Sequence, residues 1–203
     1  MRAVVLDRDA TLIDLVRDEE TGTICTAFHP SQLRLLTGVV DGLRVLQAHR
    51  FVLAIATNQP GPAKGYYSVE AVKKTNDALV AILASEGVVI SEVAACCHHP
   101  VGAPSGDASL TFDCDCRKPK PGMLHALQAS LGFDLATSWI VGDSTGDMLA
   151  GQAAGMRTGL IFADNRCELC PLRAGVSALQ KRVMPDVHGA TLLEVAEQIV
   201  ALG

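Results

Sequence analysis

Short apolar runs and helical segments alternate along this chain, and this alternation constrains its fold more than any other feature. Continuous apolar runs of this length are typical of strands buried on both faces of a parallel sheet. They occupy residues 3–6, 51–56, 93–96, 139–141 and 159–162. Segments with helical spacing or helix-capping residues occupy 68–87, 121–132, 145–154 and 191–202. The alternation predicts an α/β fold, a Rossmann-like doubly wound parallel sheet.

The length and composition indicate a single domain over residues 1–203. Of the 203 residues, 49% are hydrophobic and 19% are charged, which is enough apolar material for a sizeable core. The longest apolar runs have about six residues, whereas a membrane span needs about 20, and no signal-peptide core is present. We therefore expect a cytoplasmic protein, a monomer without membrane contact. Seven cysteines in that compartment indicate metal binding or idle thiols rather than disulfides.

The charge balance excludes one class of partner. Lys plus Arg number 17 and Asp plus Glu number 22, which gives a formal net charge of −5. No basic block is present that could neutralise a run of phosphates, so nucleic acid is not an expected partner. One or two well-placed cations could still bind a small anionic metabolite.

Polar side chains stand where several of the predicted strands end. Asp7 and Asp9 follow the first strand, Thr57 and Asn58 follow the second, and Asp143 follows the fourth. In open parallel sheets, ligands bind beyond the carboxyl ends of the strands, near the point where the strand order reverses. The sequence therefore predicts a polar site at this edge of the sheet.

Asp7 and Asp9 carry the strongest chemical signal at that edge. They are two positions apart, so on an extended chain both carboxylates point to the same side. Their repulsion would be relieved by a hard cation such as Mg²⁺, whose water ligands a substrate phosphate can replace. One carboxylate could then attack phosphorus while the other handles the proton of the leaving group. The alternative is a strand-end turn in which both residues act as caps.

Two more carboxylates, Asp143 and Asp147, stand four positions apart at a predicted strand-to-helix junction. Asp143, at the strand end, could complete the metal site. Asp147 lies in the first turn of the helix, where it could orient its neighbours or complement the helix dipole. We favour the structural role for Asp147.

These segments resemble the four motifs of the haloacid dehalogenase superfamily of phosphatases, in the same order along the chain. The matching segments are Asp7-Arg8-Asp9-Ala10-Thr11-Leu12, Thr57-Asn58-Gln59, Arg117-Lys118-Pro119, and Gly142-Asp143 with Asp147. Each motif alone is weak, whereas four in order, each on its expected element, are specific. The resemblance covers about two-thirds of the chain.

The resemblance implies hydrolysis of a phosphate monoester through an aspartyl-phosphate intermediate. Asp7 would be the nucleophile, and Asp9 the general acid and then the general base. Thr57 would hydrogen-bond the phosphoryl oxygens, and Lys118 would offset their charge. Asp7, the backbone carbonyl of Asp9 and Asp143 would hold Mg²⁺. The alternative for Lys118 is a solvated Arg-Lys pair before a turn.

A cluster of cysteines and histidines flanks a loop that is rich in Gly, Pro, Ser and Asp. The tight pairs are Cys96 with His98 and Cys114 with Cys116. Two such pairs could form a closed, tetrahedral and therefore structural Zn²⁺ site within loop 96–116. Cys97 and His99 are competing ligands, and the alternative to zinc is a group of buried reduced thiols beside a surface histidine.

The zinc-loop residues, together with 57–65 and 117–123, resemble the family of D-glycero-D-manno-heptose 1,7-bisphosphate 7-phosphatases. The resemblance implies that the zinc loop replaces a separate cap domain and orders Arg117 and Lys118 at the mouth of the site. Arg117 would then read the second phosphate or the hydroxyls of the substrate, and Asn58 is expected beside Thr57 as a further substrate contact. The implied substrate is a heptose 1,7-bisphosphate, the implied partner a small phosphorylated sugar.

Two other readings of function remain open. Histidinol-phosphate phosphatases share the zinc loop, so the substrate could be histidinol phosphate or another small phosphorylated metabolite. A non-catalytic, zinc-stabilised binding module is a further alternative.

Three features depart from the family pattern or stand outside it. Ala10 occupies a position where the family usually has glycine, a mild change if the backbone angle there suits alanine. Residues 15–22 replace a short stretch similar to His-Gly-Tyr that would contact the sugar; within them, Arg17 could supply a substitute contact or belong to a solvated charge run. Cys167 and Cys170 have no partner ligands near them in sequence, and we expect them to be loop thiols.

Overall fold

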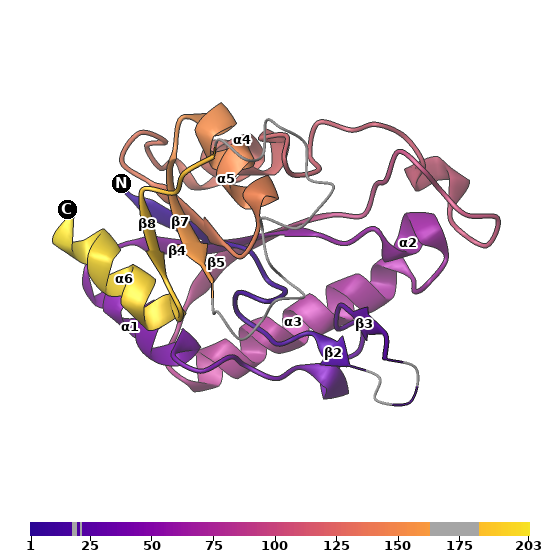
Figure 1. Ribbon diagram of the computed structural model, residues 1–203, viewed down its shortest axis with the longest axis horizontal. Coiled ribbons are helices and arrows are strands. Elements are labelled where there is room, and N and C mark those ends of the chain that lie inside the picture. Colours follow the sequence, from indigo (N-terminus) through magenta and orange to yellow (C-terminus); the bar gives the residue numbers. More distant parts are fainter. Residues whose placement is uncertain (18–19, 21, 163–182) are drawn as a thin grey trace.

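The computed structural model describes residues 1–17, 20, 22–162 and 183–203, and a parallel sheet forms its centre (Figure 1). The sheet has six strands in the order β5-β4-β1-β6-β7-β8, and each neighbouring pair is parallel. The strands are β1 (Ala3–Leu6), β4 (Val52–Asn58), β5 (Ile90–Cys96), β6 (Trp139–Gly142), β7 (Arg157–Ile161) and β8 (Val187–Gly189). This arrangement confirms the predicted doubly wound α/β fold.

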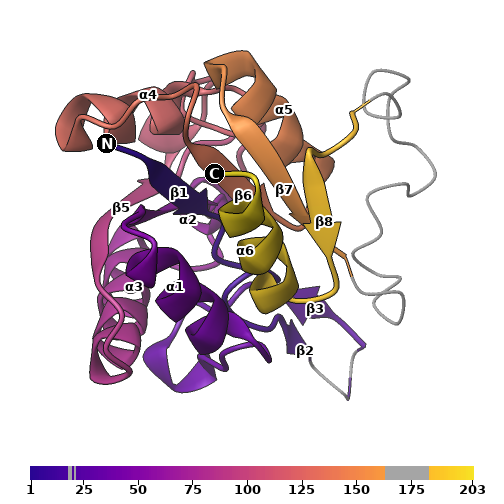
Figure 2. The same ribbon diagram turned by 90° about the vertical axis from the view of Figure 1, so that its left-hand side faces the viewer.

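Helices cover both faces of the sheet (Figure 2). The described helices are α1 (Val39–Ala48), α2 (Gly61–Lys64), α3 (Val69–Ser85), α4 (Gly122–Leu131), α5 (Thr145–Ala154) and α6 (Leu192–Ala201). Helices α1, α3 and α6 pack on one face with Val4 and Leu6, whereas α4 and α5 pack on the other with Ala3 and Val5. Successive residues of β1 therefore feed two separate cores, which explains why the run is continuously apolar.

Strand β1 lies at the point where the strand order reverses. It pairs with β4 on one side and with β6 on the other, and the backbone N–H of Asp7 donates to the Val141 carbonyl at 2.8 Å. The carboxyl ends of these three strands consequently meet around Asp7, which is where an open α/β sheet binds its ligand.

The structure contains strands that the sequence pattern does not predict. An antiparallel hairpin of β2 (Val16–Arg17) and β3 (Ile24–Cys25) follows the first strand, and β8 adds an edge to the sheet. The strand predicted at 93–96 begins at Ile90, and the one predicted at 159–162 covers Arg157–Ile161. Short 3-10 helices occupy Pro30–Gln32 and Ala108–Leu110.

Two further expectations concern the cysteines near residue 170 and membrane-spanning helices. Cys167 and Cys170 lie outside the described residues. Among residues 1–17, 20, 22–162 and 183–203, no helix is both long and apolar enough to span a bilayer.

Candidate active site

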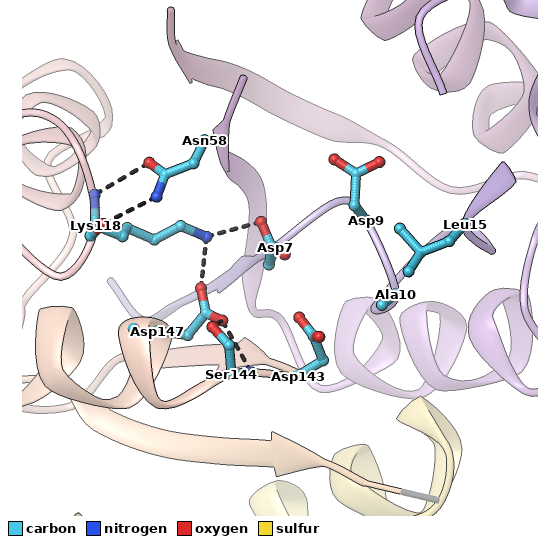
Figure 3. A pocket seen from close by; sticks show the side chains of 10 residues that line it. Asp7, Asp9, Ala10, Leu15, Asn58, Lys118, Asp143, Ser144 and Asp147 are labelled. Atoms are coloured by element: carbon cyan, nitrogen blue, oxygen red, sulfur yellow. Dashed lines mark hydrogen bonds and ion pairs between the residues drawn. The ribbon is translucent and has the colours of Figure 1, made fainter. Parts of the chain in front are cut away.

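A cavity opens at the carboxyl end of β1, and the strand-end residues meet around it (Figure 3). It has a volume of about 190 Å³, and its lining includes Asp7, Asp9, Asn58, Lys118 and Asp143. These side chains come from the ends of three neighbouring strands and from the loop before α4. The structure therefore brings together four of the strand-end residues, Asp7, Asp9, Asn58 and Asp143, whereas Thr57 is not part of the cavity lining.

Lys118 is the positive centre of this cavity. Its ammonium donates to Asp7 Oδ1 at 2.7 Å, to Asp147 Oδ1 at 2.5 Å and to the Ala56 carbonyl at 2.7 Å. Burial alone would lower the pKa of Lys118, but the carboxylates of Asp147 and Asp7 more than offset it and raise the pKa. Lys118 therefore stays charged, and the alternative of a solvated surface pair is wrong.

Asp147 combines the two roles that the sequence offered for it. Ser144 caps α5, and its N–H and hydroxyl both donate to Asp147 Oδ2, at 3.2 Å and 2.6 Å. The other oxygen accepts from Lys118. Asp147 thus closes the first turn of the helix and also orients the lysine.

Lys118 alone cannot balance the acidic groups that line the cavity. Burial, opposed in part by Lys118, raises the pKa of Asp7 to about 7. Burial and then the neighbouring Asp7 raise the pKa of Asp143 well above its usual value. Carboxylate oxygens of Asp7, Asp143 and Asp147 lie within 4.8 Å of one another, and Asp147 already serves Lys118 and Ser144. The pair of Asp7 and Asp143 therefore fits a hard divalent cation such as Mg²⁺.

Of the predicted substrate contacts, Asn58 has other partners in the structure. The Asn58 side chain donates to the Lys118 carbonyl at 2.9 Å and accepts from the Lys118 N–H at 3.1 Å, so it fixes the backbone that carries the lysine. Thr57 is fully buried at the end of β4. Arg117 is partly buried, and its Nη1 atom is buried without a hydrogen-bond partner.

The cysteine pairs converge on a second candidate metal site. The Cys96 Sγ atom lies 3.6 Å from Cys114 Sγ and 3.1 Å from Cys116 Sγ, and His98 Nδ1 lies 3.1 Å from Cys116 Sγ. Ligands about 2.3 Å from a tetrahedral zinc ion stand about 3.8 Å apart, so the four side chains need little movement to hold one. The donor set of three sulfurs and one imidazole suits structural Zn²⁺.

The competing ligands Cys97 and His99 are absent from this cluster, whose members are Cys96, His98, Cys114 and Cys116. His99 Nδ1 instead bonds the backbone of Val101, 3.0 Å from its nitrogen and 2.7 Å from its oxygen. The structure thus selects one of the ligand sets that the spacing allowed. The last residue of the cluster, Cys116, directly precedes Arg117 and Lys118, so the cluster anchors the segment that carries Lys118.

Comparison with known proteins agrees with this geometry. Residues 115–167 match the HAD-hydrolase-like family model. A protein of Pasteurella multocida named D-glycero-beta-D-manno-heptose-1,7-bisphosphate 7-phosphatase is 37% identical over 154 residues, which cover 75% of this chain and 77% of that protein. The chain belongs to the haloacid dehalogenase superfamily of phosphatases. An Escherichia coli K12 protein of the same name is 33% identical over 77% of this chain and 76% of its own length.

A solved structure extends the likeness to the whole fold of this phosphatase. The crystal structure of D,D-heptose 1,7-bisphosphate phosphatase from B. bronchiseptica, complexed with magnesium and phosphate, superposes with a TM-score of 0.75 at 26% sequence identity. The alignment covers 100% of both chains. The haloacid dehalogenase-type fold is thus confirmed.

The phosphatase site contains side chains to which the sequence analysis assigned no role. Arg8 is fully buried, and its guanidinium donates to Asp9, to Asn76 Oδ1 at 2.7 Å and to Thr26 Oγ1 at 2.6 Å. Gln59 is fully buried and also contacts Asp9. Both stand inside matched motifs. Arg8 lies between the two predicted catalytic carboxylates, and Gln59 lies two positions after Thr57; these positions were the signal available in the sequence.

The turn after Asp9 corrects the expectation for Ala10. Ala10 has a φ of 60°, in the left-handed region that alanine adopts at a cost of about 1–2 kcal/mol. The backbone angle therefore does not suit alanine. Leu15, from the stretch that replaces the family's sugar-contacting loop, lines the same cavity.

We expect Ala10→Gly to stabilise the phosphatase by about 0.5–1 kcal/mol, because relief of the left-handed strain exceeds the added entropy of the unfolded chain. The melting temperature should rise by about 1–4 °C. Ala153→Gly, at an exposed position within α5, is the matched control and should lower stability. Equal effects of the two substitutions would contradict the strain at residue 10.

We expect Lys118→Met to destabilise the phosphatase by about 3–5 kcal/mol, because it leaves the buried carboxylates of Asp7 and Asp147 without their cation. Thermal unfolding measures the loss. Lys120→Met is the control, since Lys120 is more exposed and pairs with the exposed Asp113; its melting temperature should barely change. Similar losses in both variants would contradict the buried ion-pair assignment.

Proposed function

We propose that this phosphatase removes the 7-phosphate from D-glycero-D-manno-heptose 1,7-bisphosphate through an aspartyl-phosphate intermediate. The observation that carries the proposal is the buried Asp7–Lys118 pair, which faces the cavity beside Asp143 at the switch point of the sheet. The names of relatives that are 37% and 33% identical over three quarters of the chain or more support this substrate. Residues 1–203 would act as one catalytic domain.

In the first step, the Asp7 carboxylate attacks phosphorus and the bond to the sugar oxygen breaks. Asp9 gives a proton to that leaving oxygen. Thr57 donates a hydrogen bond to the phosphoryl oxygens, and Lys118 offsets the charge that builds on them.

In the second step, water attacks the phosphorus of the acyl phosphate and restores the Asp7 carboxylate. Asp9 now accepts the proton of the attacking water, so it returns to its starting state. Inorganic phosphate leaves with the oxygen that the water supplied.

The raised pKa values of Asp7 and Asp143 support a cation between them, since both groups must be ionised to act. Mg²⁺ held by these carboxylates and by the Asp9 carbonyl would neutralise charge on the phosphoryl oxygens. The neighbouring cluster of Cys96, His98, Cys114 and Cys116 would hold structural Zn²⁺. Thiols kept as metal ligands fit a reducing compartment such as the cytoplasm.

Arg117 is the residue we assign to the second phosphate of the substrate. Its buried Nη1 atom lacks a hydrogen-bond partner, a state that costs about 1–3 kcal/mol unless a ligand supplies the acceptor. A phosphate group accepts from a guanidinium with good geometry. Asn58 supports the same region by holding the Lys118 backbone.

The test is phosphate release from the heptose 1,7-bisphosphate with Mg²⁺, compared with histidinol phosphate and hexose phosphates. We expect a preference in kcat/KM of at least about 10²-fold for the bisphosphate, equivalent to about 2.7 kcal/mol from contacts to its second phosphate. Removal of Mg²⁺ with a chelator should stop release, and added Mg²⁺ should restore it.

Each outcome has a definite meaning. Preference for histidinol phosphate or a hexose phosphate would keep the mechanism and replace the substrate. Absence of release from every ester would favour the non-catalytic binding module.

A further inference from the structure

Gln59 is a buried amide whose side chain touches two residues of the proposed chemistry. It follows β4 and is fully buried. Its Nε2 donates to Asp9 Oδ2 at 2.6 Å and to Thr57 Oγ1 at 2.9 Å. The two hydrogens of one amide nitrogen therefore join the proposed acid–base residue to the proposed phosphoryl ligand.

The third contact of Gln59 sets the orientation of the amide. The Tyr67 hydroxyl donates to Gln59 Oε1 at 3.1 Å. Rotation of the amide by half a turn would place Oε1 against the Asp9 carboxylate and Nε2 against the phenol. In its ionised form, in which it accepts from Arg8 and Thr26, Asp9 offers no proton to Oε1, so the observed orientation is strongly preferred.

Tyr67 is itself well fixed. Its ring stacks on Phe28 with a centroid distance of 5.3 Å and an interplanar angle of 9°, and a Cβ at Gly61 would overlap the ring. Burial and then the Asp9 charge raise the pKa of Tyr67 to about 12, so the phenol remains a donor at neutral pH. The ring thus offers a stable hydrogen-bond donor to the amide.

The contact with Thr57 decides which way its hydroxyl proton points. Because Thr57 Oγ1 accepts from Gln59, its own proton is directed away from the amide. Asp9 also accepts from Arg8, at 3.1 Å to Oδ2, and from Thr26, whose hydroxyl donates to Oδ1 at 2.5 Å. Gln59 completes the set of donors that fixes the Asp9 carboxylate.

We infer that Gln59 is a positioning residue, which orients the Thr57 hydroxyl as a donor toward the phosphoryl group and fixes the Asp9 carboxylate. Tyr67 in turn fixes the orientation of the Gln59 amide. This inference rests on the roles proposed above for Thr57 and Asp9. Gln59 acts through these two residues, and Tyr67 acts through Gln59.

The test is a double-mutant cycle in which turnover of p-nitrophenyl phosphate with Mg²⁺ is measured. Gln59→Leu should lower kcat by about 10²-fold, with a smaller change in KM, because misplaced groups cost most in the transition state. Tyr67→Phe keeps the stacked ring and should lower kcat by about 5-fold, the worth of one neutral hydrogen bond. Introduced into Gln59→Leu, Tyr67→Phe should have no further effect.

The controls separate positioning from folding. Tyr66→Phe, on a neighbouring tyrosine that is 74% exposed, should leave kcat unchanged. Gln59→Glu, of the same size, is a second variant that cannot keep both donations, because a carboxyl group carries at most one proton; it should show a comparable loss if Gln59→Leu folds poorly. Thermal melts report the folded fraction to which each kcat is normalised.

Two results would overturn the inference. One is a kcat of the folded Gln59 variants within about 2-fold of wild type, and the other is a Tyr67→Phe loss that is equal in both backgrounds. Asp7→Asn, measured alongside, separates the failures. If Asp7→Asn retains turnover, the proposed function fails and this inference with it, whereas Asp7-dependent turnover that is indifferent to Gln59 overturns this inference alone.

Discussion

Asp7→Asn is expected to lower phosphate release by about 10⁴-fold or more, because in the proposed mechanism Asp7 forms the covalent bond to phosphorus. The fold should survive, since asparagine has the same shape and its Oδ1 can still accept from Lys118, which lies 2.7 Å away. Steady-state phosphate release measures the loss, and a thermal melt checks the fold.

A direct readout accompanies this loss of activity. A brief incubation of the wild type with a labelled ester should leave a phosphoryl group on residue 7 that hydroxylamine releases, as expected of an acyl phosphate. The variant should carry none. Asp77→Asn, at an exposed position of α3 where Asp77 pairs with Lys73, is the control and should keep wild-type turnover. Retention of turnover or of label by Asp7→Asn would exclude Asp7 as the nucleophile.

The parallel sheet and its edge of polar residues could be predicted from the sequence for a physical reason. Strands buried on both faces leave continuous apolar runs, and β1, with all four residues buried, is the clearest case. Once the runs are assigned, topology brings the carboxyl ends of β1, β4 and β6 together. Asp7, Thr57 and Asp143 could therefore be grouped from the sequence alone.

The short strands could not be predicted, because an apolar pattern of two or three residues is too brief to indicate a strand. The hairpin strands β2 and β3 have two residues each, and β8 has three, of which Val187 is buried and His188 is exposed. Pairing at a sheet edge, not local apolar periodicity, makes β8 a strand. The strained turn at Ala10 could not be predicted for a different reason, because the φ angle of a residue depends on the surrounding packing.

The sequence also could not show which residues contact the predicted site residues. Lys118 and Asp147 are 29 positions apart, and only the fold brings them to 2.5 Å. Asn58, an expected substrate contact, lines the cavity and also binds the Lys118 backbone through both ends of its amide. Close spacing in the sequence limited the candidate metal ligands to a few cysteines and histidines. Only the geometry leaves Cys97 and His99 outside the cluster.

Cys96→Ser is expected to weaken zinc binding by at least about 10²-fold, because it replaces a thiolate of a four-ligand site by a poor ligand. Elemental analysis should give close to one equivalent of zinc per chain in the wild type and far less in the variant. A 10²-fold loss corresponds to about 2.7 kcal/mol of the folding free energy that the metal supplies, so the melting temperature should fall by about 5–10 °C.

Turnover should fall with the zinc content, because the cluster leads directly into the segment that places the Lys118 ammonium 2.7 Å from Asp7. Cys97→Ser is the matched control: Cys97 is the next residue and is also buried, but its thiol stands outside the ligand cluster. It should keep its zinc, its melting temperature and its activity. A wild-type protein that is fully folded without zinc would contradict the structural role of the metal. Equal behaviour of the two serine variants would instead contradict the assignment of Cys96 as a ligand and Cys97 as a bystander.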